Sequence, residues 1–164
     1  AKSNLDVNPK FVRVPLESEQ LYNFPFCIFS GEGRFSLTDA QRENLYNYLT
    51  QGGFILASPG CSDKAWDESL RKEVKLVFPE YELRKIPMTH NVFRVIYNIP
   101  ALHDKKGNTV LVEGLFIKGR LAMVYSQEGL NDVRNAKGCC CCGGNEIQEA
   151  QNVNVNILIY SLLH

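Results

Sequence analysis

The sequence feature that most constrains the fold lies between Ser36 and Cys61. It consists of a helix pattern, two glycines and then a short apolar run. Ser36 can cap the helix with its hydroxyl, and Asp39 favours the positive end of the helix dipole, as in a capping box with Asp in place of Glu. Gly52 and Gly53 end the helix, because glycine adopts the left-handed conformation of the C′ position without a steric penalty. This unit is typical of an α/β domain.

Two short apolar runs flank this helix and have the character of strands. Phe26–Phe29 precedes the helix and Phe54–Ala57 follows it. Unbroken apolar runs of this length are typical of strands that are buried on both faces. The apolar stripe of the helix itself consists of Leu37, Ala40, Leu45, Tyr48 and Leu49. Two buried strands joined by one amphipathic helix predict a right-handed parallel crossover.

A second helix follows, with Pro79 just beyond its end. Its apolar side chains recur at i, i+4, i+8 and i+11, which predicts a helix that covers the sheet. These side chains are Trp66, Leu70, Val74 and Val77. Residues 82–86 predict a short strand, and residues 88–104 predict a long irregular connection.

The last part of the chain predicts a hairpin and a helix. Residues 110–117 and 121–125 have strand character, and Lys118 and Gly119 between them predict the turn, although Lys-Gly is a weaker turn signal than Asn-Gly. Residues 146–163 are ambiguous, because their apolar side chains alternate in part as in a strand and also share one helical face. We expect a helix there.

Composition and charge limit the classes of function. The chain has 164 residues with 45% hydrophobic content, which suits one domain with a substantial core. Lys plus Arg and Asp plus Glu both total 18, so the formal net charge is zero. A neutral chain has no broad basic field for phosphates, and we therefore expect no binding to nucleic acid. No apolar run approaches the roughly 20 residues of a membrane span, and the first residues lack the pattern of a signal peptide.

Two loops are predicted to border a ligand site. In an open parallel sheet, ligands bind where the carboxyl ends of the strands meet loops. Residues 30–34 and 58–63 are such loops, and if their strands are neighbours they face a shared cleft. The predicted ligand-binding residues are Gly31, Glu32, Gly33, Ser58 and Cys61. Glu32 lies between two glycines, so that its backbone can approach a ligand and its carboxylate can act as a base or ligand. The alternative is a solvated loop carboxylate.

Cys61 is also the candidate nucleophile of an alternative, enzymatic prediction. A thiol near a helix N-terminus gains thiolate character from the helix dipole. A hydrolase would then use Cys61 as nucleophile, His90 as base and Glu32 to orient it. A nucleophile elbow, however, needs glycine two residues either side of the nucleophile, where this chain has Pro59 and Asp63. The structural alternative is a small residue at a strand–helix corner.

A run of four cysteines, Cys139 to Cys142, is the most unusual composition in the chain. Cys139 and Cys142 have the spacing of one half of a zinc knuckle, and Cys27 and Cys61 would have to complete the site through the fold. Disulfides are a second possibility if the protein is exported, because the cysteine total of 6 is even. A thiol-rich loop without a site is the third. No cofactor is expected, and zinc remains open.

The order of several short motifs carries a family resemblance over nearly the whole chain. The motifs are Phe24-Pro25-Phe26, Ser30-Gly31-Glu32-Gly33, Asn44-Leu45, Tyr48-Leu49, Gly52-Gly53-Phe54, Ser69-Leu70-Arg71-Lys72-Glu73, Phe78-Pro79, His90, Glu113-Gly114, Gly119-Arg120-Leu121-Ala122, Tyr125-Ser126, Val155-Asn156 and Tyr160. In this order they resemble a bacterial family of unknown function, domain of unknown function 4159.

The resemblance implies a flavodoxin-like, class I glutamine-amidotransferase-like fold of the trehalose-utilisation type. Such a fold is a three-layer sandwich with a mainly parallel sheet, here with an added β-hairpin. The resemblance also implies that residues 1–164 form one domain that lacks its first strand and helix, and that members are often exported to the periplasm or cell envelope; a cytoplasmic location stays open. The chain departs from working amidotransferases, because it lacks the nucleophile elbow and a His-x-Glu pair near its end.

These observations lead to one preferred function and two alternatives. The preferred prediction is a non-catalytic domain that binds a small ligand or a protein partner at the cleft beside Glu32 and Cys61. The first alternative is the Cys61-dependent hydrolase. The second is an exported domain stapled by metal or disulfides through Cys139 to Cys142.

Overall fold

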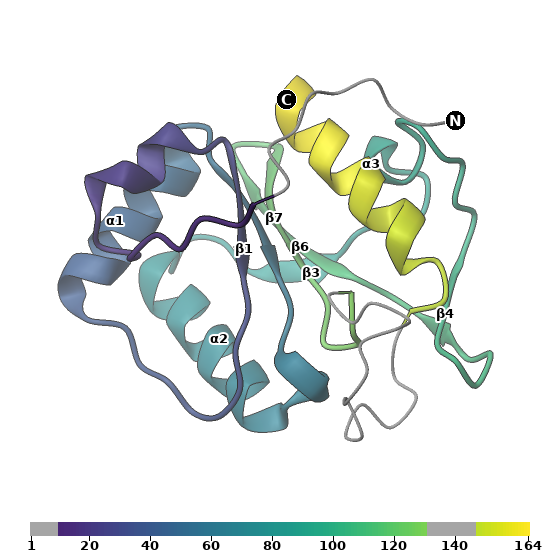
Figure 1. Cartoon of the computed structure of the whole chain (residues 1–164), viewed down its shortest axis with the longest axis horizontal. Helices are drawn as coiled ribbons and strands as arrows, with labels where there is room; N and C mark the ends of the chain where they lie inside the picture. The colour runs from purple at the N-terminus through teal and green to yellow at the C-terminus, as the bar shows by residue number, and fades with distance from the viewer. Residues whose placement is uncertain (1–9, 131–146) are drawn as a thin grey trace.

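The computed structural model describes residues 10–130 and 147–164 (Figure 1). The α-helices and strands in chain order are β1 Phe26–Phe29, α1 Asp39–Thr50, β2 Phe54–Ala57, α2 Lys64–Val77, β3 Leu83–Lys85, β4 Leu102–His103, β5 Thr109–Val110, β6 Glu113–Ile117, β7 Arg120–Tyr125 and α3 Ala150–Leu163. Three short 3-10 helices, Glu19–Asn23, Gly60–Ser62 and Asn91–Phe93, lie between them in the described part of the chain.

A mixed five-stranded sheet in the order β1-β2-β7-β6-β3 forms the centre of the molecule. β1 and β2 are parallel neighbours, with Phe26 opposite Phe54, and β2 is parallel to β7. The predicted parallel pairing of the first two strands is therefore confirmed. β6 runs antiparallel to both β7 and β3. The carboxyl ends of β1, β2 and β7 consequently lie at one edge of the sheet, which we call the carboxyl edge.

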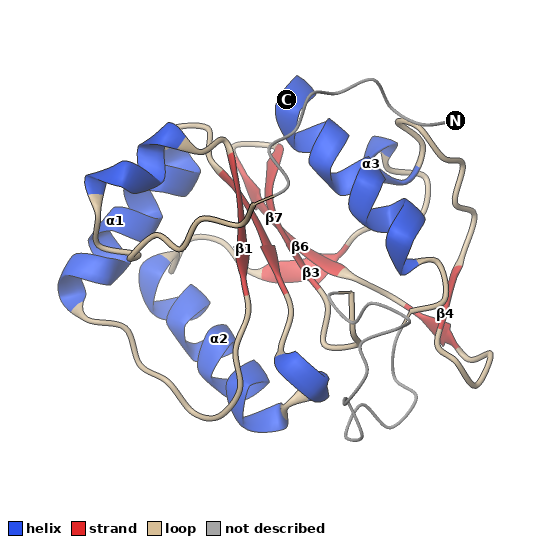
Figure 2. Ribbon diagram, in the orientation of Figure 1, coloured by secondary structure: helices blue, strands red, loops and turns tan. Residues whose placement is uncertain are grey.

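Helices cover both faces of the sheet (Figure 2). α1 and α2 lie on one face and α3 lies on the other (Figure 1). Burial agrees with this layering, because Ile55 and Ala57 of β2 belong to one apolar cluster and Phe54 and Leu56 to the other. The predicted stripe on α2 is confirmed, since its members are buried against the sheet: Trp66, Leu70, Val74 and Val77. The chain is thus an α/β protein with a mixed sheet, in which β1, β2 and β7 are parallel.

The start of α1 differs from the sequence prediction. Thr38, and not Ser36, is the N-cap residue, and its hydroxyl accepts a hydrogen bond from the Gln41 N–H. The Gln41 side chain accepts in return from the Thr38 N–H, which completes a capping box. Ser36 instead donates its hydroxyl to Glu73 on α2. Thr-x-x-Gln is the stronger signal, because both reciprocal bonds can form.

The prediction that β1 is buried on both faces is wrong. β1 is an outer strand of the sheet in the described part of the chain, and the Ile28 side chain is 43% exposed. β2, by contrast, is buried along its whole length. An apolar run alone does not reveal whether a strand is central or at an edge.

The predicted hairpin forms between β6 and β7. Lys118 and Gly119 both have positive φ, 50° and 81°, as a type I′ turn requires. The first predicted strand is too long, however, because Val110 belongs to β5, which pairs with β4 in a separate two-stranded sheet.

The preferred helix near the chain's end is confirmed as α3, which begins at Ala150. Residue 146, at which the sequence predicts this helix to begin, lies outside the described residues. Asn156 is fully buried and binds the irregular connection, since its amide oxygen accepts from Ile96 and Tyr97 N–H groups and its amide nitrogen donates to the Tyr97 carbonyl. These hydrogen bonds attach α3 to the irregular connection. Over the described residues, every helix is too short or too polar to cross a bilayer.

Candidate functional site

The two predicted ligand loops lie side by side at the carboxyl edge. The Ser58 N–H donates to the Phe29 carbonyl at 3.2 Å, and the Gly60 N–H donates to the Gly31 carbonyl at 2.8 Å. A methyl group at Gly60 would lie 2.9 Å from the Glu32 carboxylate, so the Glu32 side chain lies directly over this glycine. Pairing of the parallel strands therefore continues into the loops, which brings the two loops together.

Asp63 joins the same two loops and begins α2. Its carboxylate accepts from the Trp66 N–H at 2.8 Å, and hydrogen bonds from the Trp66, Gly33 and Ala65 backbone hold its pKa below the ordinary value. The positive end of the α2 dipole is thus already compensated by a carboxylate of the chain itself. A thiol at Cys61 gains correspondingly less from this dipole.

The end of the second loop, just before α2, has a strained backbone. Cys61 and Ser62 both have positive φ, 50° and 54°, which glycine tolerates but side chains with a Cβ avoid. Such a conformation costs about 1–2 kcal/mol per residue and persists only where the surrounding contacts hold it. Strain of this kind is concentrated at functional sites, so the turn marks this edge as a candidate site.

A third segment, after β7, completes the carboxyl edge. The Ser126 N–H donates to the Ala57 carbonyl at 3.2 Å, and its hydroxyl donates to the Glu128 carbonyl at 2.8 Å. The buried Ser58 hydroxyl donates to the same carbonyl at 3.5 Å. These bonds hold residues 126–128 beside the loop that follows β2.

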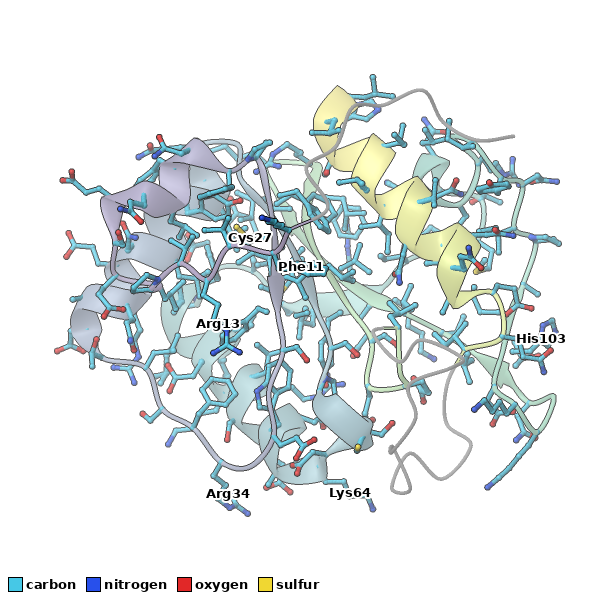
Figure 3. The ribbon with its side chains drawn as sticks, in the orientation of Figure 1. Phe11, Arg13, Cys27, Arg34, Lys64 and His103 are labelled. Atoms are coloured by element: carbon cyan, nitrogen blue, oxygen red, sulfur yellow. The ribbon has the colours of Figure 1, made fainter. Side chains whose placement is uncertain are left out.

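The loop after β2, the start of α2, the segment after β7 and the β4–β5 hairpin line a pocket of about 200 Å³, which we call the carboxyl-edge pocket. Its lining residues are Ser62, Lys64, Asp104, Gln127 and Glu128. Figure 3 shows Lys64 and Arg34 at the same end of the molecule, where β1 and β2 deliver their loops. The lining side chains are polar, and within the described residues the Lys64 ammonium forms no ion pair.

Asp104 is the buried member of this pocket. Its carboxylate accepts from the Lys106 N–H, the Asn108 N–H and the Asn108 side-chain amide at 2.8–2.9 Å. Hydrogen bonds from Asn108 hold the Asp104 pKa below its ordinary value. A carboxylate can accept about four hydrogen bonds, so one acceptor position is left for a ligand. Asp104 therefore offers a charged, preoriented oxygen at the pocket wall.

A partly buried polar network supports the walls of the pocket. The Tyr125 hydroxyl and the Arg71 Nε both donate to one carboxylate oxygen of Asp67, the latter at 2.9 Å. Arg71 also forms a two-point ion pair with Glu113 at 3.2 and 2.6 Å. We call these four residues the Asp67 network. Because Tyr125 precedes the 126–128 segment and Asp67 follows Lys64 on α2, the network fixes two walls relative to each other.

A sequence comparison identifies the family of this chain. The sequence model of the family described as "Domain of unknown function (DUF4159)" matches residues 1–162. The chain belongs to this family. The family resemblance drawn from the sequence motifs is thereby confirmed. No curated protein matches the chain.

This DUF4159 chain does not bring His90 to Glu32 and Cys61. The His90 ring contacts Phe116 and Tyr160, with ring centroids 5.7 and 5.4 Å apart, and Tyr160 contacts Phe54 at the start of β2. Cys61 follows the other end of β2. His90 thus lies at the opposite edge of the sheet, where burial and the nearby His164 lower its pKa. The expected Cys61–His90–Glu32 arrangement is not assembled.

The other sequence predictions have mixed outcomes in the DUF4159 chain. Gly31 and Gly33 lie in the paired loops, but their contacts are to the protein itself, namely Gly60 and Asp63. Cys139 and Cys142 lie outside the described residues. Within residues 10–130 and 147–164, no group of three or more His, Cys, Asp or Glu side chains could hold a metal ion.

Most residues that line the pocket were not predicted from the sequence. Ser62 lies in the predicted loop 58–63 and Lys64 directly follows it, but Gln127 and Glu128 follow a strand that was predicted only as half of a hairpin. The missing signal was the parallel pairing of β7 with β2, which is a contact between distant parts of the chain. Asp104 was placed at the end of an irregular connection, and Asp-x-x-x-Asn is the local turn signal that marks it.

Proposed function

We propose that this DUF4159 domain binds a small polar molecule in the carboxyl-edge pocket and does not catalyse a reaction on it. The observation that carries the proposal is the pocket itself, with its preoriented Asp104 carboxylate and its Lys64 ammonium. A volume of about 200 Å³ is below the range typical of drug-sized ligands, so the ligand is small. The separation of His90 from Cys61 argues for binding in place of hydrolysis.

The charge of the pocket lining determines whether a cationic or an anionic ligand is preferred. Asp104 and Glu128 supply two carboxylates, and Lys64 supplies one ammonium. A ligand with an ammonium and a hydroxyl group therefore gains more than a ligand with a carboxylate, because it meets both acidic side chains. Ser62 and Gln127 offer neutral hydrogen-bond partners to the remaining polar atoms.

An amidotransferase-like scaffold is part of this proposal. The layering of helices on both faces, the parallel order β1-β2-β7 and the glycine pair before β2 support it. In such α/β sheets the carboxyl edge is the usual place for ligands. Export to the periplasm or cell envelope remains a prediction from the family resemblance, and fractionation of cells that express the full protein would test it.

A matched pair of small probes tests the proposed site. Ethanolamine and glycolate have similar size and opposite charge, and each would be titrated into ¹⁵N-labelled protein. We expect ethanolamine to shift the amide signals of Ser62, Lys64, Asp104 and Gln127 with a Kd of about 1–10 mM, since so small a ligand makes few contacts. Glycolate should bind at least about threefold more weakly.

Single-charge variants provide the controls for this titration. Glu128→Gln should weaken ethanolamine binding about three- to tenfold, whereas Lys64→Gln should strengthen it. Lys72→Gln makes the same charge change on α2 away from the pocket and should leave the Kd unchanged. Absence of saturable shifts at the pocket amides with either probe would contradict the proposed function, and stronger binding of glycolate would overturn its charge argument.

A further inference from the structure

A second pocket lies between α2 and β3, away from the carboxyl-edge pocket. It has a volume of about 280 Å³, and we call it the α2–β3 pocket. Its lining residues are Arg71, Val74, Lys75, Pro79, Tyr81, Glu82 and Leu83. None of these residues lines the carboxyl-edge pocket. The two pockets therefore have no lining residue in common.

One part of the α2–β3 pocket is apolar. Val74 is buried in the core, while Tyr81 and Leu83 pack against that core and are only partly buried. Pro79 adds a rigid ring beside them. Apolar side chains that the core leaves partly exposed gain free energy when an apolar body covers them.

The polar part of the pocket is cationic. Arg71 carries five N–H donors, of which Asp67 takes one and Glu113 takes two. Two donors of this half-exposed guanidinium therefore remain available. Lys75, one turn further along α2, forms no ion pair within the described residues. Glu82 is the single carboxylate of the lining, and because Asp67 and Glu113 pair with Arg71, Lys75 supplies the positive charge of the pocket that has no ion-pair partner within the described residues.

We propose that the α2–β3 pocket binds a small carboxylate with an apolar body. The carboxylate would accept from Lys75 and from one of the two remaining Arg71 donors, and the apolar body would cover Val74, Tyr81 and Leu83. This combination of an apolar surface with a few convergent polar groups is typical of small-molecule sites. The ion pair with Glu113 holds the Arg71 guanidinium in place, so its free donors are preoriented.

Three phenyl compounds that differ in one group test the proposal. Phenylacetate, phenylacetamide and phenethylamine are titrated into the full chain by isothermal titration calorimetry, with the methyl signals of Val74 and Leu83 followed by NMR. We expect phenylacetate to bind with a Kd of about 0.1–1 mM and to shift both methyl signals. The neutral amide should bind about tenfold more weakly, because it loses the charge-assisted contacts, and the amine should not bind measurably.

Charge variants on α2 and the adjoining loop locate the effect. Lys75→Ala should weaken phenylacetate binding about three- to tenfold, Lys75→Arg should retain it, and Glu82→Gln should strengthen it. Lys72→Ala is the matched control, and an unchanged melting temperature verifies that each variant is folded. Equal affinity for the acid and the amide, an equal loss in Lys72→Ala, or shifts away from Val74 and Leu83 would each overturn the proposal. Because the carboxyl-edge pocket is assayed with other probes and other amides, either proposal can fail alone.

Discussion

The most buried charge in the described part of the core is the carboxylate of Glu73, which is 1% exposed. It forms a two-point ion pair with Arg42 of α1 at 2.8 and 3.2 Å, and it accepts the Ser36 hydroxyl. The Arg42 guanidinium is the main cause that holds the Glu73 pKa below its ordinary value of 4.5. A buried carboxylate with these partners fixes α1, α2 and the loop before α1 in one arrangement.

Glu73 therefore predicts a defined dependence of stability on pH. A pKa that is lower in the folded state than in the unfolded state means that the ionised carboxylate stabilises the fold above pH 4.5, and that this contribution is lost as the pH falls below this value. Glu73→Gln should lower the free energy of unfolding at pH 7 by about 2 kcal/mol, because the ion pair is lost. Urea denaturation of both proteins at pH 7 and pH 3 would measure this. The difference should shrink at pH 3, and a difference that grows there would contradict the role assigned to the ion pair.

At the scale of elements, contacts within a few residues were predictable and pairings between distant segments were not. The end of α1 at the glycine pair, the α2 stripe and the Lys118–Gly119 turn all have local causes, namely backbone conformation and helical spacing. The edge position of β1 and the parallel pairing of β7 with β2 depend on which strands meet, and no local pattern contains that information. The shift of the α1 cap from Ser36 to Thr38 shows that the competing signal two residues later, Thr-x-x-Gln, was the stronger one.

The Asp67 network joins α2 to β7, and one hydroxyl makes its contribution testable. Tyr125→Phe removes the buried donor to Asp67 but keeps the ring beneath the Arg71 guanidinium. We expect a loss of about 1–2 kcal/mol in the free energy of unfolding, because the loss of a hydrogen bond to a charged partner is only partly compensated by Arg71.

Tyr22→Phe is the matched control for this change. It removes an exposed hydroxyl that donates to the Asn44 side chain at 2.7 Å, and we expect an effect within about 0.5 kcal/mol. Guanidinium denaturation of both variants measures the comparison. Equal effects of the two substitutions would show that the Asp67 network adds no stability beyond an ordinary surface hydrogen bond.

At the scale of the whole molecule, the fold brings segments that are distant in the sequence together at the carboxyl edge. The loops after β1 and β2 were predictable as a ligand edge, because two buried strands joined by a helix imply parallel neighbours. The pocket itself was not predictable, since it needs the segment after β7 and Asp104 from the β4–β5 hairpin, which reach the edge only through tertiary pairing. The same topology places His90 at the opposite edge, although its sequence position gave no indication of this.

Crystals soaked with ethanolamine test most directly whether the carboxyl-edge pocket binds a small polar cation. We predict electron density for the ligand between Lys64, Asp104 and Glu128, with its ammonium within hydrogen-bond distance of the free acceptor position on Asp104 and with weaker density in Glu128→Gln crystals soaked at the same concentration. Density for ethanolamine only at other places on the molecule, or an empty pocket at saturating concentration, would contradict the claim.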